Sequence, residues 1–270
     1  PVLISMTSEC LQLQAINPNL CIKNDASYHD MYYMNPPAKD LSKIASSDKV
    51  KKVQKDFEAT HVRPERLMKT LFTDEAYVKA NVDEARLMRR LFDLACNMQS
   101  HDTDMQLYSL FTDEECYDLW SCNNLYWYLT HACSPVTDGL MPYREADLLR
   151  NILDRADAAL KEGKKQATLR FGHESCLLPL VALLELNHYG ESYPDVEKLS
   201  EQWRAYDIFP MASNVQFVFF HKKGSNDVLV KVLLNEKETK LPVKTDVAPY
   251  YHWKDVESYY REKLDKYQHI

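Results

Sequence analysis

The stretch RFGHESCLLPLVALLEL, residues 170–186, decides the interpretation of this chain. Gly172 is followed directly by His173, Glu174 and Ser175, and a mostly apolar run comes next. This order predicts a short strand, a glycine turn and a buried helix. A helix N-terminus presents free N–H groups and the positive end of the helix dipole. We therefore expect an anion such as phosphate to bind at this turn.

Each residue of the turn has a role that suits phosphate chemistry. Gly172 would let the backbone approach a ligand closely, and His173 would donate a hydrogen bond to a phosphoryl oxygen. Glu174 would protonate a leaving oxygen, provided that its surroundings keep it protonated. Ser175 would cap the helix or contact the anion. The alternative is ordinary, because a histidine before a buried helix is commonly a hydrogen-bonded structural residue.

The composition argues against several other classes of protein. The 270 residues carry a net charge of −7 without a dominant basic block, which disfavours nucleic-acid binding. The five glycines form neither G-x-G-x-x-G nor a P-loop. No apolar run approaches the roughly 18 residues that a spanning helix needs. The seven cysteines contain no C-x-x-C pair, which disfavours a cysteine zinc site; a pair such as Cys116 with Cys133 stays open.

The hydrophobic spacing predicts helices from about residue 39 to residue 160 and mixed structure on either side. A cap at Thr112 and a stop at Gly163 support two of these helices. The predicted helices cover residues 5–18, 48–62, 64–72, 82–99, 111–133, 147–163, 175–190 (ending at Gly190) and 256–267. The predicted strands cover ATLRFG (167–172), QFVFF (216–220) and VLVKVLL (228–234), with KKGSND (222–227) as a hairpin connection. Asn35-Pro36-Pro37 is a breaker.

We therefore predict an α/β protein in which a sheet domain, with helices on both faces, carries a large and mostly α-helical insertion. Residues 1–36 form one part of the α/β domain, residues 37–162 form the helical insertion, and residues 163–270 form the remainder of the α/β domain with the His-Glu motif.

The quoted stretch resembles the C-terminal active-site motif of the histidine acid phosphatases, and most closely that of the multiple inositol polyphosphate phosphatase and phytase branch. Four other segments resemble stretches of that branch in the same order. They are SYHDMYYMN (27–35), PMASNVQFVFF (210–220), VLVKVLLNEKETKLPV (228–243) and WKDVESYY (253–260). The resemblance spans nearly the whole chain and is strongest in residues 165–260.

This resemblance implies a histidine-phosphatase-like fold and hydrolysis of phosphomonoesters in two steps. The histidine of an N-terminal R-H-G-x-R-x-P motif becomes phosphorylated, and arginines hold the phosphate by bidentate contacts. By the same resemblance, His173 stabilises the transferring group and Glu174 protonates the leaving oxygen. No metal or other cofactor is implied, the partner is a phosphorylated small molecule, and the location is periplasmic or secreted.

The chain departs from the family pattern in two respects. Much of the family has His-Asp and the inositol polyphosphate branch has His-Ala-Glu, whereas this chain has His-Glu-Ser, so that Ser175 stands where the second pattern keeps its acid. None of the nine histidines lies in R-H-G-x-R-x-P. His61 and His101 are interpreted as surface residues. We expect the chain to be the C-terminal two-thirds of a phosphatase that needs the missing N-terminal segment of the same protein.

Other residues have weaker signals. Arg144 precedes a helix and would reach an anionic substrate, or would be a solvated side chain in a first turn. Arg170 can point to either face, and Lys222 with Lys223 suit a solvated hairpin tip. The aromatic residues of LYWYLTH (125–131) suit a core.

The functional prediction is phosphomonoester hydrolysis through a phosphohistidine, acting on inositol polyphosphates such as phytate. One alternative is a broader acid or sugar phosphatase. The other is a non-catalytic phosphate-binding module of the same fold.

Overall fold

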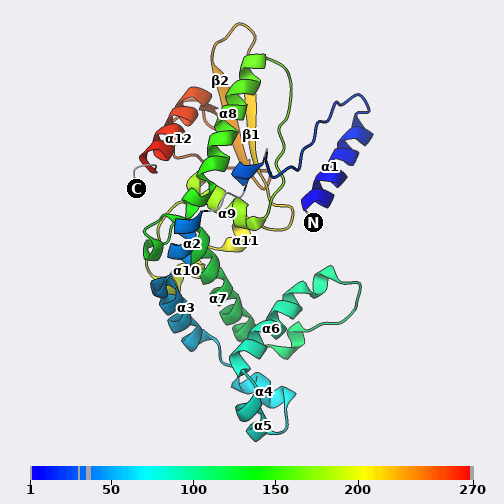
Figure 1. Ribbon diagram of the computed structural model, residues 1–270, viewed down its shortest axis with the longest axis vertical. Coiled ribbons are helices and arrows are strands. Elements are labelled where there is room, and N and C mark those ends of the chain that lie inside the picture. Colours follow the sequence, from blue (N-terminus) through cyan, green and yellow to red (C-terminus); the bar gives the residue numbers. More distant parts are fainter. Residues whose placement is uncertain (1, 30, 35–37, 268–270) are drawn as a thin grey trace.

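The computed structural model describes residues 2–29, 31–34 and 38–267 (Figure 1). The predicted breaker at residues 35–37 lies outside the described residues. The α-helices are α1 (Val2–Ile16), α2 (Lys39–Ala45), α3 (Asp48–His61), α4 (Glu65–Leu71), α5 (Glu75–Asn81), α6 (Glu84–Asn97), α7 (Asp113–His131), α8 (Ala146–Glu162), α9 (Glu174–Leu183), α10 (Leu199–Gln202), α11 (Ala205–Ile208) and α12 (Trp253–Tyr267). The short 3-10 helices include η1 (Tyr32–Met34), η5 (Met141–Glu145) and η6 (Val196–Lys198).

Local signals place the ends of several helices as predicted. Thr112 caps α7, and its hydroxyl accepts a hydrogen bond from Glu115 N while the Glu115 carboxylate accepts one from Thr112 N. This reciprocal pair is a capping box. At the other end of the helical region, α8 stops at Gly163, whose φ of 66° is a left-handed conformation that glycine adopts without strain.

The sheet is built around one antiparallel hairpin. Strands β1 (Val215–His221) and β2 (Val228–Leu234) pair along their whole length, from Val215 opposite Leu234 to His221 opposite Val228. The short strands β3 (Lys237–Glu238) and β4 (Tyr251–His252) both pair with β2. The predicted hairpin connection is confirmed, and Gly224 at its tip has a φ of 83°.

Helix α12 covers this sheet with one apolar stripe. Trp253, Val256, Tyr260 and Leu264 are buried at helical spacing, and α12 packs against β2, β4 and α8. On the sheet, Val230, Val232 and Leu234 alternate inward along β2. These side chains join those of α7, α8 and α9 in one large hydrophobic core.

A second and smaller core lies far from the sheet. It is formed by Leu67, Met68, Val78, Met88, Ala95, Phe111 and Leu119, which come from α4, α5, α6 and the start of α7. Figure 1 shows these helices at the end of the molecule opposite the hairpin. Helix α7 joins the two cores, because Leu119 belongs to the small one and Leu125 to the large one. We call residues 64–112, which supply all of the small core except Leu119, the distal lobe.

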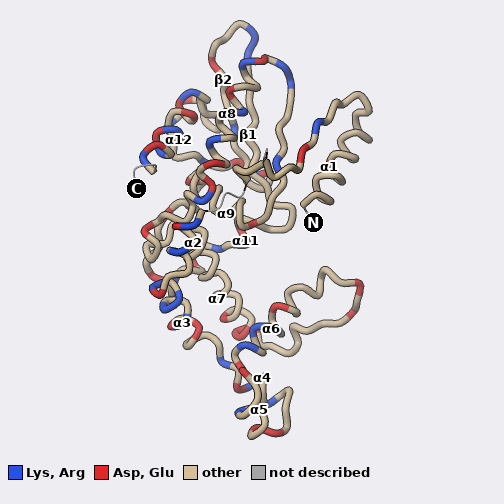
Figure 2. The backbone as a smooth tube through the Cα atoms, viewed as in Figure 1, with Lys and Arg blue, Asp and Glu red and all other residues tan. Residues whose placement is uncertain are grey.

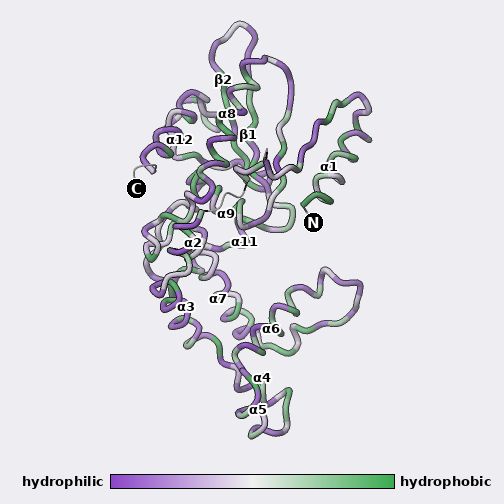
Figure 3. The backbone as a smooth tube through the Cα atoms, in the orientation of Figure 1, coloured by the Kyte–Doolittle hydropathy of each residue, from purple (hydrophilic) through white to green (hydrophobic). Residues whose placement is uncertain are grey.

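Helix α1 differs from every other long helix in its packing. None of its residues is buried, and Leu3, Ile4, Leu11 and Ile16 are all more than half exposed. Figure 3 shows hydrophobic residues along the length of α1. A segment without regular structure links it to η1 (Figure 1).

Two sequence predictions were wrong in detail. Residues 167–172 do not form a strand, because no described strand lies beside them to supply the ladder of hydrogen bonds. Helix α9 ends at Leu183 instead of Gly190, and Glu185 follows with a φ of 53°. Gly190 serves close packing instead, since a Cβ there would lie 2.6 Å from Glu185 Cγ.

The predicted fold class is confirmed as a mixed fold of helices and a sheet. The sheet is antiparallel in the described residues. The three predicted domain segments stay a prediction. Among the described residues, no helix combines the length and apolar character needed to cross a membrane.

Candidate functional site

The structure places the His-Glu-Ser turn at the N-terminus of α9. His173 is the N-cap residue, and its carbonyl accepts hydrogen bonds from Cys176 N at 3.0 Å and Leu177 N at 3.1 Å. The side chains of His173 and Glu174 are exposed, and neither has a hydrogen-bond partner among the described residues. His173 therefore does not make the structural hydrogen bond that the ordinary alternative expected. Both groups are free to meet a ligand beside the open end of a buried helix.

Packing against η1 fixes the backbone of this turn. Cys176 Sγ donates a hydrogen bond to Met34 O at 3.3 Å. A Cβ added to Gly172 would lie 3.4 Å from Met34 Cε, which leaves little room for a larger residue. The structure thus brings together two segments, 27–34 and 170–176, that are far apart in the sequence.

Arg170 contacts α8 and η1 and is not part of the exposed His-Glu turn. Its Nη2 donates to Asn151 Oδ1 on α8 at 2.6 Å, and its guanidinium lies 5.9 Å from the centre of the Tyr33 ring. Burial lowers the pKa of this guanidinium. The sequence left the direction of Arg170 open, and the structure shows it bridging α8 and η1.

Arg144 lies in η5, which packs against α9. Burial raises the pKa of the Cys176 thiol, while the positive charge of Arg144 acts on that thiol in the opposite direction. Arg144 is half-buried and forms no ion pair with a described acid. The role of Arg144 in holding an anion therefore stays a prediction. The charge of Arg144 lies within electrostatic reach of the first turn of α9, as an anion site requires.

Ser175 and Glu145 complete the surroundings of the turn. Ser175 is half-buried and lies in the first turn of α9. Sequence reasoning missed Glu145, which is only 2 % exposed and whose Oε2 has no described partner. The available signal was an acid among the apolar positions of MPYREADLL, next to Arg144.

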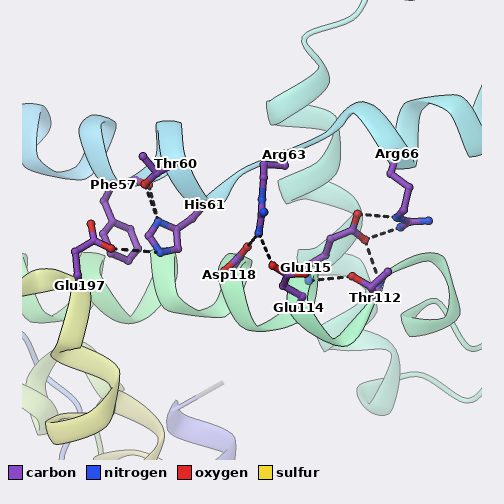
Figure 4. A network of polar contacts seen from close by, with 10 residues as sticks. All are labelled: Phe57, Thr60, His61, Arg63, Arg66, Thr112, Glu114, Glu115, Asp118 and Glu197. Atoms are coloured by element: carbon purple, nitrogen blue, oxygen red, sulfur yellow. Dashed lines mark hydrogen bonds and ion pairs between the residues drawn. The ribbon is translucent and has the colours of Figure 1, made fainter.

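The two histidines interpreted as surface residues differ. His101 is exposed as predicted. His61 is half-buried, because its ring stacks on Phe57 at a centroid distance of 3.8 Å and its Nε2 lies 3.7 Å from Glu197 Oε2 (Figure 4). It joins α3 to η6, and the surface interpretation of His61 was wrong.

The other minor predictions are mostly confirmed. Lys222 and Lys223 are exposed at the hairpin tip. The core interpretation of LYWYLTH holds for Leu125, Tyr128 and Leu129, which are at most 1 % exposed.

The seven cysteines are free thiols in the structure. Cys116 lies in the first turn of the 19-residue α7, and Cys133 lies just beyond its last. At 1.5 Å per residue their Cα atoms are roughly 25 Å apart, which excludes the pair that the sequence left open. Among the described residues, no three His, Cys, Asp or Glu side chains are placed to hold a metal ion together.

The clearest hollow of the structure lies elsewhere. It measures about 580 Å³ and lies between the second half of α8 and the hairpin tip, where Asp157, Lys161 and His221 line it. None of residues 170–176 contributes to it. This hollow is therefore separate from the His-Glu turn.

Comparisons with known proteins show which family this chain resembles. The family model of the histidine phosphatase superfamily, branch 2, matches residues 20–235. Human multiple inositol polyphosphate phosphatase 1 is 28% identical over 134 residues, which cover 45% of this chain and 27% of that protein. Two crystal structures of the multiple inositol polyphosphate phosphatase of Bifidobacterium longum are also similar at 19% identity. The complex with inositol hexasulfate has a TM-score of 0.53, and the complex with phosphate has one of 0.58.

The comparisons also show how much of this chain and of each relative is matched. The two crystal structures align with 90% of this chain, but the chain covers only 59% and 60% of theirs. The chain thus spans between about a quarter and three fifths of the relatives it matches. The family model covers far more than half of the 270 residues, including the whole His-Glu turn. The chain belongs to the histidine phosphatase superfamily, branch 2.

Proposed function

We propose that this chain is part of a phosphatase that removes phosphate groups from inositol polyphosphates such as phytate, and that it supplies the His173–Glu174 half of the active site. The observation that carries the proposal is the exposed and unpartnered His-Glu pair at the N-terminus of α9. The family match and the names of the relatives support the class of reaction and substrate.

In this proposal, a phosphate group of the substrate binds in front of the first turn of α9. The free N–H groups and the dipole of the helix attract the anion, His173 donates a hydrogen bond to a phosphoryl oxygen, and Arg144 adds a positive charge. These groups act most strongly on the negative charge that develops in the transition state.

The chemistry then takes two steps. A histidine nitrogen attacks phosphorus, the bond from phosphorus to the leaving oxygen breaks, and Glu174 gives its proton to that oxygen. Water next attacks the phosphorus of the phosphohistidine, the bond from phosphorus to the histidine nitrogen breaks, and the Glu174 carboxylate accepts a proton from the water. No R-H-G-x-R-x-P motif occurs in the 270 residues, so the proposal takes the nucleophile from an N-terminal segment of the same protein.

Glu174 suits the role of proton donor better than Ser175. Glu174 is exposed at the edge of the turn, where a leaving oxygen would lie. Ser175 is half-buried, and a hydroxyl is too weak an acid to protonate a leaving alcohol at neutral or acid pH. We assign Ser175 to contact with the anion.

One observation favours the broader alternative within the same class. Arg144 is the cationic side chain that the described structure places beside the first turn of α9, whereas a substrate with many phosphates is suited by several cations. A general acid or sugar phosphatase would need fewer of them. The non-catalytic module is the outcome expected if no segment supplies a nucleophile.

Phosphate release from phytate between about pH 3 and pH 8 tests the proposal, on full-length protein of known intact mass. We expect His173→Ala to abolish release, and Glu174→Gln to reduce it most for poor leaving groups. His101→Ala, at an exposed histidine in a loop of the distal lobe, is the matched control and should retain full activity. Release that survives His173→Ala would refute the assignment of this motif.

No release of phosphate from phytate, but release from other phosphomonoesters, would favour the broader phosphatase. Binding of inorganic phosphate without any hydrolysis would favour the non-catalytic module.

The proposal places the protein in the periplasm or outside the cell, and fractionation of the producing cells followed by a phosphatase assay tests that location.

A further inference from the structure

Glu145 occupies an unusual place for an acid. It is the last residue of η5 and the residue that precedes α8, and its side chain is 2 % exposed. Oε2 has no hydrogen-bond partner among the described residues, and the side chain forms no ion pair. A buried carboxylate without a cation or hydrogen bonds costs several kcal/mol, so buried acids are almost always paired or neutral.

The elements packed around Glu145 supply few charges that would stabilise its ionised carboxylate. Arg144 on the same element favours the carboxylate, and Asp147 on α8 opposes it. On α9 the Cys176 thiol interacts electrostatically with Glu145. At the end of α7, which also packs against η5, the pKa of His131 is lowered to about 4 by burial and then by Arg144. On α2, Asp40 and Lys43 pair with each other at the surface at 3.0 Å. Burial dominates and raises the pKa of Glu145 to about 8.

Glu145 also acts on the candidate site. η5 packs against α9, and the pKa of the Cys176 thiol is raised by burial and then by the charge of Glu145. Cys176 lies in the first turn of α9, directly after the His-Glu-Ser residues. A negative charge on Glu145 would therefore oppose the binding of an anion at this turn.

We propose that Glu145 is a positioning residue that keeps its proton: as a neutral acid it fills the core behind the first turn of α9, and its ionisation weakens phosphate binding there. The second part rests on the proposed function, whereas the first part does not. The proton of Glu145 would thus set an alkaline limit to the activity of the site, independently of Glu174.

The first test measures stability and needs no catalysis. Glu145→Gln keeps the size and the hydrogen-bonding groups of the neutral acid but cannot ionise. The folded state holds the Glu145 proton more tightly than the unfolded state, so its stabilisation is complete below about pH 4.5 and is lost as pH rises through about 8. Between about pH 5 and pH 9, the folding equilibrium constant of the wild type should fall by on the order of a hundredfold to a thousandfold relative to Glu145→Gln.

Urea unfolding at several pH values measures this difference. Glu162→Gln, the same substitution at an exposed residue at the end of α8, should follow the wild type throughout. Parallel curves for wild type and Glu145→Gln would overturn the proposal. If Glu145→Gln does not fold, infrared spectra of the wild type decide: a protonated carboxylic acid band that persists at about pH 6.5 supports the proposal, and its absence overturns it.

The second test uses the full-length protein and the pH profile of phosphate release. With Glu145→Gln, the ratio of activity at about pH 9 to activity at about pH 6 should rise roughly tenfold, because about nine tenths of wild-type Glu145 is ionised at the higher pH. Glu162→Gln should leave the ratio unchanged. An unchanged ratio with Glu145→Gln overturns the link to the site while the phosphatase assignment stands. If no variant releases phosphate, the proposed function fails, and the stability curves still decide the protonation of Glu145.

Discussion

The two ends of α7 lie in regions that are held together by different forces. Around its C-terminal half, Tyr128 and Leu129 are fully buried in the large core with α9 and the sheet. Around its N-terminal half, the small core of the distal lobe is accompanied by ion pairs between α7 and the segment that joins α3 to α4 (Figure 4). Figure 2 shows acidic and basic residues side by side at this junction.

The ion pairs form two neighbouring groups at the start of α7. Arg63 Nη2 lies 2.5 Å from Asp118 Oδ2 and 3.0 Å from Glu114 Oε1. Arg66 holds Glu115 with two contacts, from Nε at 2.7 Å and from Nη2 at 2.5 Å. Glu115 is also the acid of the capping box of α7. The start of α7 and the attachment of the distal lobe therefore share the same carboxylate.

This difference has consequences for function. Hydrophobic burial depends little on salt and pH, whereas partly exposed ion pairs are weakened by both. The candidate site at α9 lies on the large hydrophobic core, which suits a turn that must be held rigidly for catalysis.

The largest expected effect comes from the core beneath the candidate site. Leu178→Ala removes a fully buried side chain of α9 and leaves a cavity in the large core. We expect the free energy of unfolding to fall by about 2–5 kcal/mol, measured by urea denaturation. Leu169→Ala, at a residue that is 53% exposed just before the motif, is the control and should change it by less than about 0.5 kcal/mol. Equal effects of the two substitutions would contradict the packing described for α9.

The second effect should be confined to the distal lobe. The double variant Arg63→Ala/Arg66→Ala leaves the nearly buried carboxylate of Asp118, with a side chain 10% exposed, without its cation. We expect faster hydrogen exchange in α4, α5 and α6, and unchanged exchange in β2 and α9. Arg86→Ala, an exposed arginine of α6 without an ion pair among the described residues, is the control. Equal loss of protection in both regions would show that the two cores unfold as one unit.

The sequence was most informative where one local signal determines one structure. Thr112 with Glu115 and the stripe of α8 before Gly163 each located a helix end, and the alternation of β2 located the hairpin. The His-Glu-Ser turn was found because its three polar residues stand directly before an apolar run. In these places the chemistry lies within a few consecutive residues.

The sequence was least informative where the partner is distant in the chain. Residues 167–172 have strand-like composition, but a strand also needs a neighbour. The contact of His61 with Glu197 depends on how α3 meets η6. The sequence shows Glu145 only as an acid among apolar positions, and its burial results from the packing of η5 against α9, which those residues do not specify.

A smaller effect should appear when the pH falls. Arg66 lowers the pKa of Glu115, opposed by desolvation. A carboxyl whose folded pKa is depressed stabilises the fold above its unfolded pKa of about 4.5, and this stabilisation is lost as pH falls through the folded value. Because Arg66 is 44% exposed, the contribution should stay below about 1 kcal/mol. Methyl NMR spectra below about pH 4.5 should show changes at Val78 of the lobe before changes at Val230 of β2. The reverse order would contradict the assignment of this ion pair to the lobe.

The smallest effect should appear at the hairpin, with the opposite dependence on pH. His252 Nδ1 lies 3.0 Å from Asp227 and Nε2 lies 2.9 Å from Asp246 Oδ1, so that one ring joins the hairpin to the loop before β4. The hydrogen bond to Asp227, followed by that to Asp246, raises the pKa of His252 to about 9. This clamp is complete below about pH 6.5 and is lost as pH rises through about 9. Hydrogen exchange in residues 221–228 should therefore accelerate above about pH 9, beyond the intrinsic dependence on pH, and His252→Gln should remove the transition. A transition that persists in His252→Gln would assign it to another group. The distal lobe, which contains no part of this clamp, should not respond, so acid and alkali would each loosen a different end of the molecule.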